Sequence, residues 1–317
     1  MNKIICKILV LVLIVCSLTS CKELKSRTVF LMDTVITVEA ENDEIIDKII
    51  SSVKEVDSAL NFHNEQSDLS KFNILRSTRN TPILTDCLKK AYDYSNKTNG
   101  AFNMNLGQVT SLYNFNEQIA PSAEYTDLLL PTISPENLVI FSEEIRLING
   151  ALVDLGGIAK GYALEKAINI LKTENHKEVY LNFGGSIYCL SSAPQVIGIK
   201  KPFTENEIAA ELLVNNRAVT TAGNYERCFT KDGEFYHHIL DGKTGLPVNN
   251  GVNSVTVVST SAIDGDVYST ALFVMGIDEG MAFANKNNIA AVFILKDGSI
   301  RLSNALKYNK DNKIVLN

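Results

Sequence analysis

The sequence predicts an α+β fold in which mixed sheets are flanked by helices. Residues 28–39 form a run rich in β-branched side chains, which predicts a strand. Residues 43–60 repeat isoleucine and valine at helical spacing instead, which predicts an amphipathic helix. Because helical and strand patterns follow one another without a regular β-α-β alternation, an α+β arrangement is favoured over a doubly wound parallel sheet.

The later elements continue this mixture, with no internal repeat of fixed period. In chain order we expect a helix over 84–97 ending at Asn99-Gly100, a hairpin over 138–153, a helix over 159–172, a strand-rich region up to 258, helices over 263–275 and 278–287, and a hairpin turning at 296–299. Three prolines in segment 116–137 predict a long surface loop there.

Composition indicates an ordinary globular protein. The 317 residues are 45% hydrophobic and 21% charged, which allows one large core or two modest ones. The formal net charge of -6 is spread along the chain, and no basic stripe suited to phosphate backbones is present. We therefore expect no nucleic-acid partner.

The N-terminus has the form of a bacterial export signal. Lys3 and Lys7 precede an apolar run over 8–16, which is too short to span a bilayer as a helix because a span needs about 20 residues. Leu18-Thr19-Ser20-Cys21 follows and resembles a lipobox. We expect residues 1–20 to be a signal peptide, residues 21–27 a tether lipidated at Cys21, and residues 28–317 one catalytic domain. A plain secretory signal with an incidental cysteine is the alternative.

Three cysteines remain in the expected domain, namely Cys87, Cys189 and Cys228. They allow at most one disulfide, although an exported protein meets an oxidising compartment. No Cys-x-x-Cys pair or Cys/His cluster is present, so a zinc site is not expected.

The most informative segment runs from Asp154 to Ala163 and has the sequence DLGGIAKGYA. It lies between a predicted strand and a predicted helix, where glycines let backbone amides approach an anion at the helix N-terminus. Its spacing matches neither the dinucleotide-binding nor the P-loop glycine pattern. Taken alone, it predicts either a phosphate contact or an ordinary tight turn.

Two further segments concentrate polar side chains. Residues 236–247 place His237 and His238 beside an aspartate and a glycine-bearing turn, a combination suited to proton transfer or phosphate contact. Asp266 and Thr270 are four residues apart at the start of an apolar helix, so they share a face and could offer two hard oxygens to Mg²⁺. A helix N-cap is the alternative for this second segment.

Seven segments together resemble the FAD:protein FMN transferase family, also called ApbE. They are Met32-Asp33-Thr34, Gly100 to Asn103, Asp154 to Ala163, Leu181 to Tyr188, Thr220 to Arg227, His237 to Pro247 and Asp266 to Gly276. They occur in the family's order behind a lipobox and span essentially all of 28–300. The resemblance implies a single ApbE-like, T-fold-like catalytic domain.

The resemblance also implies roles for ten residues. As FAD contacts it implies Met32, Ala101, Phe102, Asn103, Asp154, Lys160 and His238. As metal ligands it implies Asp266, Thr270 and a backbone carbonyl from the glycine turn, that of Gly157. His238 and Lys160 are the implied catalytic side chains, with His238 as general base and His237 as the alternative. Three positions depart from the family pattern, at Asn103, Ala222 and Asn224.

The implied reaction is a Mg²⁺-dependent transfer of FMN from FAD to a serine or threonine of an exported redox protein, with release of AMP. The enzyme would be anchored to a membrane of the cell envelope through Cys21 and face away from the cytoplasm. Two alternatives remain open. One is Mg²⁺-dependent hydrolysis of FAD to FMN and AMP, and the other is a lipoprotein that binds FAD without catalysis.

Overall fold

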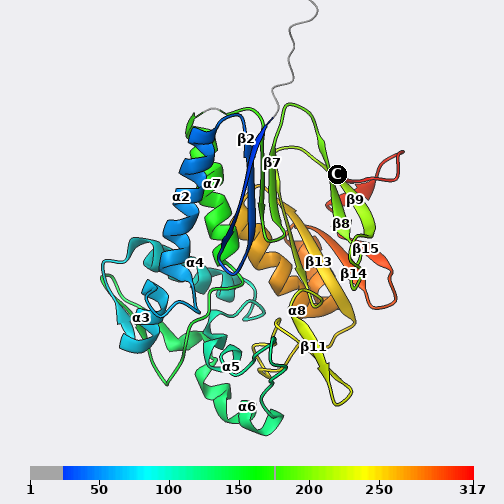
Figure 1. The fold of residues 1–317 in the computed structure, drawn as a ribbon. Helices are drawn as coiled ribbons and strands as arrows, with labels where there is room; N and C mark the ends of the chain where they lie inside the picture. Colours follow the sequence, from blue (N-terminus) through cyan, green and yellow to red (C-terminus); the bar gives the residue numbers. More distant parts are fainter. Residues whose placement is uncertain (1–23, 175) are drawn as a thin grey trace, which may run out of the picture.

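The computed structural model describes residues 24–174 and 176–317, which form three layers. An eight-stranded sheet in the order β1-β2-β6-β7-β10-β13-β14-β15 makes the central layer. The long helices α2, α7 and α8 cover one face of it, and a four-stranded sheet, β16-β17-β9-β8, packs on part of the other face (Figure 1). The predicted α+β class with mixed sheets and flanking helices is thus confirmed.

The strands of the central sheet are antiparallel neighbours throughout. They are β1 (Lys25–Leu31), β2 (Thr34–Ala40), β6 (Val179–Phe183), β7 (Ser186–Leu190), β10 (Ala218–Gly223), β13 (Val252–Ser259), β14 (Ala290–Leu295) and β15 (Ile300–Leu302). The smaller sheets contain β8 (Gln195–Lys200), β9 (Ile208–Val214), β16 (Leu306–Tyr308) and β17 (Ile314–Leu316), then β3 (Ser77–Thr78), β4 (Leu138–Ile140) and β5 (Ile145–Leu147), and finally the hairpin β11 (Cys228–Lys231) with β12 (Glu234–His237).

The helices are α2 (Asp43–Leu60), α3 (Asp68–Leu75), α4 (Pro82–Lys97), α5 (Gly107–Thr110), α6 (Ala123–Leu129), α7 (Ala159–Glu174) and α8 (Ala262–Lys286), with short 3-10 turns η1 (Met104–Leu106), η2 (Leu130–Thr132) and η3 (Pro135–Asn137). Helix α2 begins and ends at the predicted residues. Its isoleucines and valines are buried against the sheet, as the periodicity requires. Asn42 caps its first turn by accepting a hydrogen bond from the Ile45 amide.

The prediction of one strand over 28–39 is wrong. The chain reverses at Met32 and Asp33, and Lys25 of β1 lies opposite Ala40 of β2. Both turn residues have positive φ, 53° and 56°, as a tight two-residue hairpin turn requires. Neither residue is a glycine or an asparagine, so the β-branched run gave no sign of the turn.

Segment 116–137 is not the predicted long loop either, because it contains α6, η2 and η3. Ser122 caps α6, and two of the prolines stand in the first turns of η2 and η3, where a missing amide hydrogen costs nothing. The two helices predicted over 263–275 and 278–287 form the single element α8, which kinks at Gly276 with a φ of 78°. Helix α3 was not predicted. The predicted hairpin over 138–153 pairs only through β4 and β5.

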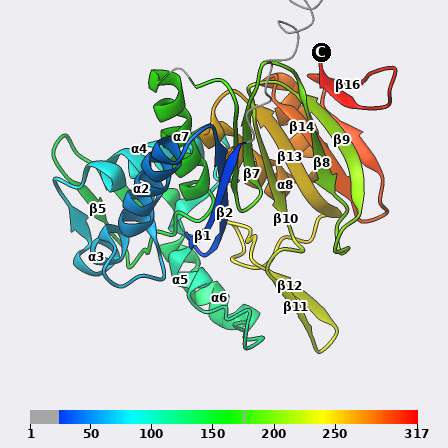
Figure 2. The same cartoon turned by 45° about the horizontal axis from the view of Figure 1, so that its top comes forward.

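One end of the molecule carries two projections. The β11–β12 hairpin and the α5–α6 segment both extend from the end at which the β1–β2 turn lies (Figure 2). Aromatic rings join them, since Phe115 meets Phe229 edge to face with ring centroids 5.8 Å apart, and Phe229 stacks on Tyr236 of its own hairpin at 5.0 Å. In the described residues no helix is long and apolar enough to cross a membrane. The predicted signal and Cys21 lie outside the described residues.

Candidate active site

A cavity of about 480 Å³ lies at the end of the central sheet, between the sheet, α7, α8 and the two projections. All ten residues predicted for the site line it: Met32, Ala101, Phe102, Asn103, Asp154, Gly157, Lys160, His238, Asp266 and Thr270. The fold therefore brings together five segments that are far apart in the sequence. Of the three departures, Asn103 and Ala222 also line the cavity, whereas Asn224 is buried behind it.

The N-terminus of α7 forms one wall. Asp154 accepts a hydrogen bond from the Gly156 amide at 2.8 Å, and Asp266 accepts one from the Gly161 amide at 2.7 Å. Two amides of the glycine turn thus already bind protein carboxylates. These two amides are therefore not free to bind a phosphate. The groups that remain for the predicted phosphate contact are the other amides of the turn and the ammonium of Lys160, which lines the cavity.

The glycines of this turn are required by close packing. A Cβ on Gly161 would lie 2.6 Å from the carbonyl oxygen of Ala262 and 2.6 Å from Cβ of Asp266, so α7 and α8 could not approach as they do. A Cβ on Gly157 would lie 3.1 Å from the Phe102 ring and 3.7 Å from the hydroxyl of Thr270. Small residues here let the turn reach Asp266 and Thr270.

Asp266 is nearly buried and is not the N-cap of its own helix. Ser261 caps α8 by accepting a hydrogen bond from the Asp264 amide. The alternative that Asp266 belongs to the N-cap of this helix is therefore wrong. Asp266 instead uses Oδ2 to hold the first turn of α7, while Oδ1 lies 3.8 Å from Nζ of Lys160. Its second oxygen therefore faces a positive charge at the cavity wall.

The donor set suits a hard divalent cation. Besides Asp266, the cavity offers the hydroxyl of Thr270 and the backbone of Gly157, which are oxygen donors of the kind that Mg²⁺ prefers. Among residues 24–174 and 176–317, no three His, Cys, Asp or Glu side chains cluster to bind a metal. A site here would thus depend on one carboxylate with hydroxyl and carbonyl oxygens, as the sequence predicted.

The two adjacent histidines have different surroundings. His237 is 2% exposed, its Nε2 donates to the Val248 carbonyl at 2.8 Å, and its Nδ1 accepts from the Ile239 amide at 3.3 Å. His238 faces the cavity, as alternation along an extended segment requires. With both ring nitrogens of His237 bonded in the core, His238 is the histidine available to a ligand.

Arg227 fixes the ring of His238. Its carbonyl accepts from the backbone amide of His238 at 3.2 Å and lies 3.4 Å from the ring Nδ1. A proton on Nδ1 satisfies that carbonyl and leaves the lone pair of Nε2 free. Burial first, and the positive charge of Arg227 second, lower the pKa of His238 well below its ordinary value. The ring is therefore neutral at pH 7 and can accept a proton.

Sequence reasoning missed several cavity residues. Arg227 brings a second cation, while Tyr113 and Phe115 come from a segment for which nothing was predicted from the sequence. Burial raises the pKa of Tyr113 to about 12, and its hydroxyl has no hydrogen-bond partner among the described residues. Asp57 and Asn61, at the end of α2, also line the cavity. Helical periodicity could not single them out, because polar residues on an amphipathic helix are expected at the surface.

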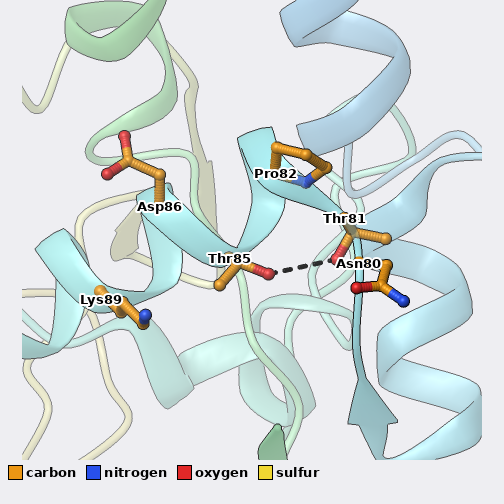
Figure 3. A pocket seen from close by; sticks show the side chains of 6 residues that line it. All are labelled: Asn80, Thr81, Pro82, Thr85, Asp86 and Lys89. Atoms are coloured by element: carbon orange, nitrogen blue, oxygen red, sulfur yellow. Dashed lines mark hydrogen bonds between the residues drawn. The ribbon is translucent and has the colours of Figure 1, made fainter. Parts of the chain in front are cut away.

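A second, smaller hollow of about 250 Å³ lies at the first turn of α4 (Figure 3), and none of the ten predicted site residues lines it. It is lined by Asn80, Thr81, Pro82, Thr85, Asp86 and Lys89. The hydroxyls of Thr81 and Thr85 are 3.3 Å apart. We assign the hollow no role, since it gathers no set of groups that suits a reaction.

Comparison with known proteins identifies the family. Residues 32–293 match the model of the ApbE family. This chain belongs to the ApbE family. It is 30% identical over 273 residues to the FAD:protein FMN transferase of Vibrio cholerae, covering 82% of this chain and 80% of that protein. It is 29% identical over 282 residues to one from Klebsiella pneumoniae, covering 85% of this chain and 88% of that protein.

Solved structures agree with this assignment. The crystal structure of the ApbE protein of Thermotoga maritima matches with a TM-score of 0.83 at 28% identity, covering 89% of this chain and 97% of that one. The flavin transferase ApbE of Vibrio cholerae matches with a TM-score of 0.77 at 26% identity, covering 89% and 97%. The predicted single ApbE-like domain is therefore confirmed as the fold of this family.

Proposed function

We propose that this protein is a Mg²⁺-dependent FAD:protein FMN transferase that attaches FMN to a serine or threonine of an exported redox protein and releases AMP. Membership of a flavin transferase family makes the chain a transferase with FAD as substrate and a protein as acceptor. The observation that carries the finer proposal is the meeting of His238, Lys160, Asp266 and Thr270 on one cavity.

In this proposal the acceptor hydroxyl attacks the phosphorus on the FMN side of the FAD pyrophosphate. A bond forms between the hydroxyl oxygen and that phosphorus, and the bond from phosphorus to the bridging oxygen breaks. AMP leaves with the bridging oxygen, and Nε2 of His238 takes the hydroxyl proton. The result is a phosphoester of FMN with the acceptor.

Side chains of the cavity supply the remaining functions. The ammonium of Lys160 adds fixed positive charge where negative charge develops on the pyrophosphate. Met32 and the Ala101-Phe102-Asn103 turn contribute part of the flavin contacts. Asp266, Thr270 and the Gly157 carbonyl would hold Mg²⁺, which when bound neutralises charge on the phosphate oxygens. The oxygen-only donor set and the nearly buried carboxylate support this assignment.

The location of the enzyme follows from its N-terminus in this proposal. The basic start, the short apolar run and the Leu-Thr-Ser-Cys sequence support lipidation at Cys21 and attachment to a membrane of the cell envelope. The acceptor would then be exposed to the same compartment outside the cytoplasm.

The test is to incubate the purified domain, residues 24–317, with FAD, Mg²⁺ and a candidate acceptor, and to follow AMP and protein-bound flavin together. Transfer gives both products in equal amounts. Hydrolysis gives AMP and free FMN, and a binding protein gives neither.

A further inference from the structure

The β1–β2 turn is held in a conformation that its residues do not favour. Met32 and Asp33 both lie in the left-handed region of φ, at 53° and 56°, where side chains other than glycine are disfavoured. Both residues line the cavity. A strained turn at a binding site persists only when neighbouring groups hold it, so the contacts of this turn are informative.

The contact that holds the turn comes from α2. Oδ1 of Asp57 accepts a hydrogen bond from the Met32 backbone amide at 3.1 Å, although 25 residues separate the two. The same oxygen accepts a second hydrogen bond, at 3.0 Å, from the side-chain amide of Asn61. Asp57 thus binds the turn and the end of its own helix with one carboxylate oxygen.

Asn61 extends this connection to a second wall of the cavity. Its Oδ1 accepts a hydrogen bond from the His63 backbone amide at 2.9 Å. His63 and the neighbouring Phe62 pack edge to face, with ring centroids 5.5 Å apart, and both line the cavity. A continuous chain of hydrogen bonds, called the relay below, therefore runs from Met32 through Asp57 and Asn61 to His63.

A carboxylate at this place needs an explanation, because FAD is an anion and the cavity already contains the carboxylates of Asp154 and Asp266. An additional negative charge weakens binding of such a ligand, so the Asp57 carboxylate should have another use that offsets this repulsion. The two hydrogen bonds that Oδ1 of Asp57 accepts supply that use.

We infer that Asp57, acting with Asn61, is a positioning residue that sets the FAD-binding conformation of the Met32 turn and the Phe62–His63 loop together. This inference rests on the proposed use of the cavity for FAD. Asp57 does not touch the reacting atoms in this account. Its loss should therefore weaken FAD binding and leave the rate at saturating FAD nearly unchanged.

The experiment compares Asp57→Ala with Asp57→Asn and with Asp47→Ala in the soluble domain. Asp47 lies on the same helix and pairs with Arg27 of β1, away from the turn, so its loss tests general loosening of the hairpin. Flavin fluorescence titration should show roughly tenfold weaker FAD binding for Asp57→Ala, since two hydrogen bonds are lost. Asp57→Asn keeps an oxygen acceptor and loses a negative charge, so it should bind FAD at least as tightly as wild type, and Asp47→Ala should bind it as wild type does.

Amide hydrogen exchange without FAD gives a second readout. The Met32 amide should exchange faster in Asp57→Ala than in wild type or Asp47→Ala. Unchanged exchange at Met32, or unchanged FAD affinity in a folded Asp57→Ala protein, would overturn the inference. So would FAD binding by Asp57→Asn as weak as that of Asp57→Ala, because that result would show that the acceptor oxygen is not what holds the turn.

If Asp57→Ala does not fold, Asn61→Ala carries the same test, with faster exchange at the His63 amide and weaker FAD binding expected. No change in either overturns the relay. If wild type itself binds no FAD, the proposed function fails, whereas the exchange measurements still decide whether the relay holds the turn.

Discussion

The carboxylate of Asp266 and the backbone amide of Gly161 are joined by a 2.7 Å hydrogen bond across 105 residues of sequence. This bond ties α8 to the first turn of α7. It leaves the other carboxylate oxygen facing Lys160 at 3.8 Å. One side chain therefore both fixes the helix N-terminus of the cavity and presents an oxygen to it, and the two duties can be separated by substitution.

Asp266→Asn should separate them. The amide oxygen of the asparagine can still accept a hydrogen bond from Gly161, so the fold should be retained. The loss of the negative charge should lower the rate of Mg²⁺-dependent turnover by a factor on the order of 10² to 10³. Asp266→Ala should additionally lower the free energy of unfolding by about 1–3 kcal/mol, because the buried Gly161 amide loses its acceptor. Thermal unfolding and AMP release measure the two effects.

The matched control is Asp264→Asn, in the first turn of the same helix, where the carboxylate accepts from the hydroxyl of Tyr94 instead. It should keep its Mg²⁺ dependence. Normal Mg²⁺-dependent turnover by a folded Asp266→Asn protein would remove Asp266 from the metal site.

His238→Ala should slow transfer and leave FAD binding nearly intact, because FAD affinity should come mainly from the glycine turn, Lys160 and the flavin pocket. Loss of a general base typically costs on the order of 10² to 10⁴ in rate. Transfer should fall more than hydrolysis does, since water can be oriented by other groups. His237→Ala is the matched comparison, and because His237 bonds Val248 in the core, its main effect should be lower stability. Flavinylation at saturating FAD decides between them, and a wild-type rate for His238→Ala would end the assignment.

The pH dependence of transfer should reflect the lowered pKa of His238. A histidine with an ordinary pKa near 6.5 would lose half of its basic form at about that pH. Since burial and Arg227 lower the pKa of His238 well below this, the ring stays neutral and the rate should remain flat from pH 7.5 to 6. A rate that halves near pH 6.5 at saturating FAD would show that His238 is not so perturbed.

The free energy of unfolding, unlike the transfer rate, should change with pH. The unfolded chain binds a proton at each histidine near pH 6.5, whereas His237 and His238 resist protonation in the folded state. The unfolded state therefore takes up more protons as pH falls, so the free energy of unfolding should decrease below about pH 6.5. Replacing His238 with glutamine should reduce that decrease, and denaturant unfolding at pH 7.5 and 5.5 measures it.

Cys21→Ala should release the protein from the membrane fraction. Lipid on this cysteine is the anchor that the sequence predicts, so a variant that carries no lipid should lose stable membrane attachment. Fractionation of cells followed by mass spectrometry of the N-terminus tests this. If the variant stays in washed membranes after its signal has been cleaved, the lipid anchor is refuted.

Patterns in the sequence predicted the elements whose periodicity is strong. Helix α2 matched at both ends because buried isoleucines and valines repeat over 18 residues. Helix α7 was also predicted, whereas the two helices expected over 263–275 and 278–287 form one element that kinks at Gly276. The β1–β2 turn was missed because strand-forming residues flank it on both sides, and the hydrogen bond to its Met32 amide comes from Asp57, 25 residues away. Contacts between distant segments decide such features, and local sequence does not contain them.

In the candidate site too, some residues could be predicted from the sequence and others only from the fold. Family motifs named ten residues, and every one lines the same cavity. Arg227 was within a recognised motif but was not assigned a role, because only the fold places its carbonyl against the His238 ring. Tyr113 and Asp57 lie outside the motifs, and their presence at the cavity depends on how the α5–α6 segment and α2 pack. Chemistry concentrated in short motifs is predictable, whereas the surrounding support is not.

The most direct test of FMN transfer measures AMP and protein-bound FMN from one reaction containing the purified domain, FAD, Mg²⁺ and an exported acceptor with a reactive serine or threonine. We expect equal amounts of the two products, formed only with Mg²⁺ and lost when the acceptor serine or threonine is replaced by alanine. AMP accompanied by free FMN, with no flavin on the acceptor, would contradict FMN transfer.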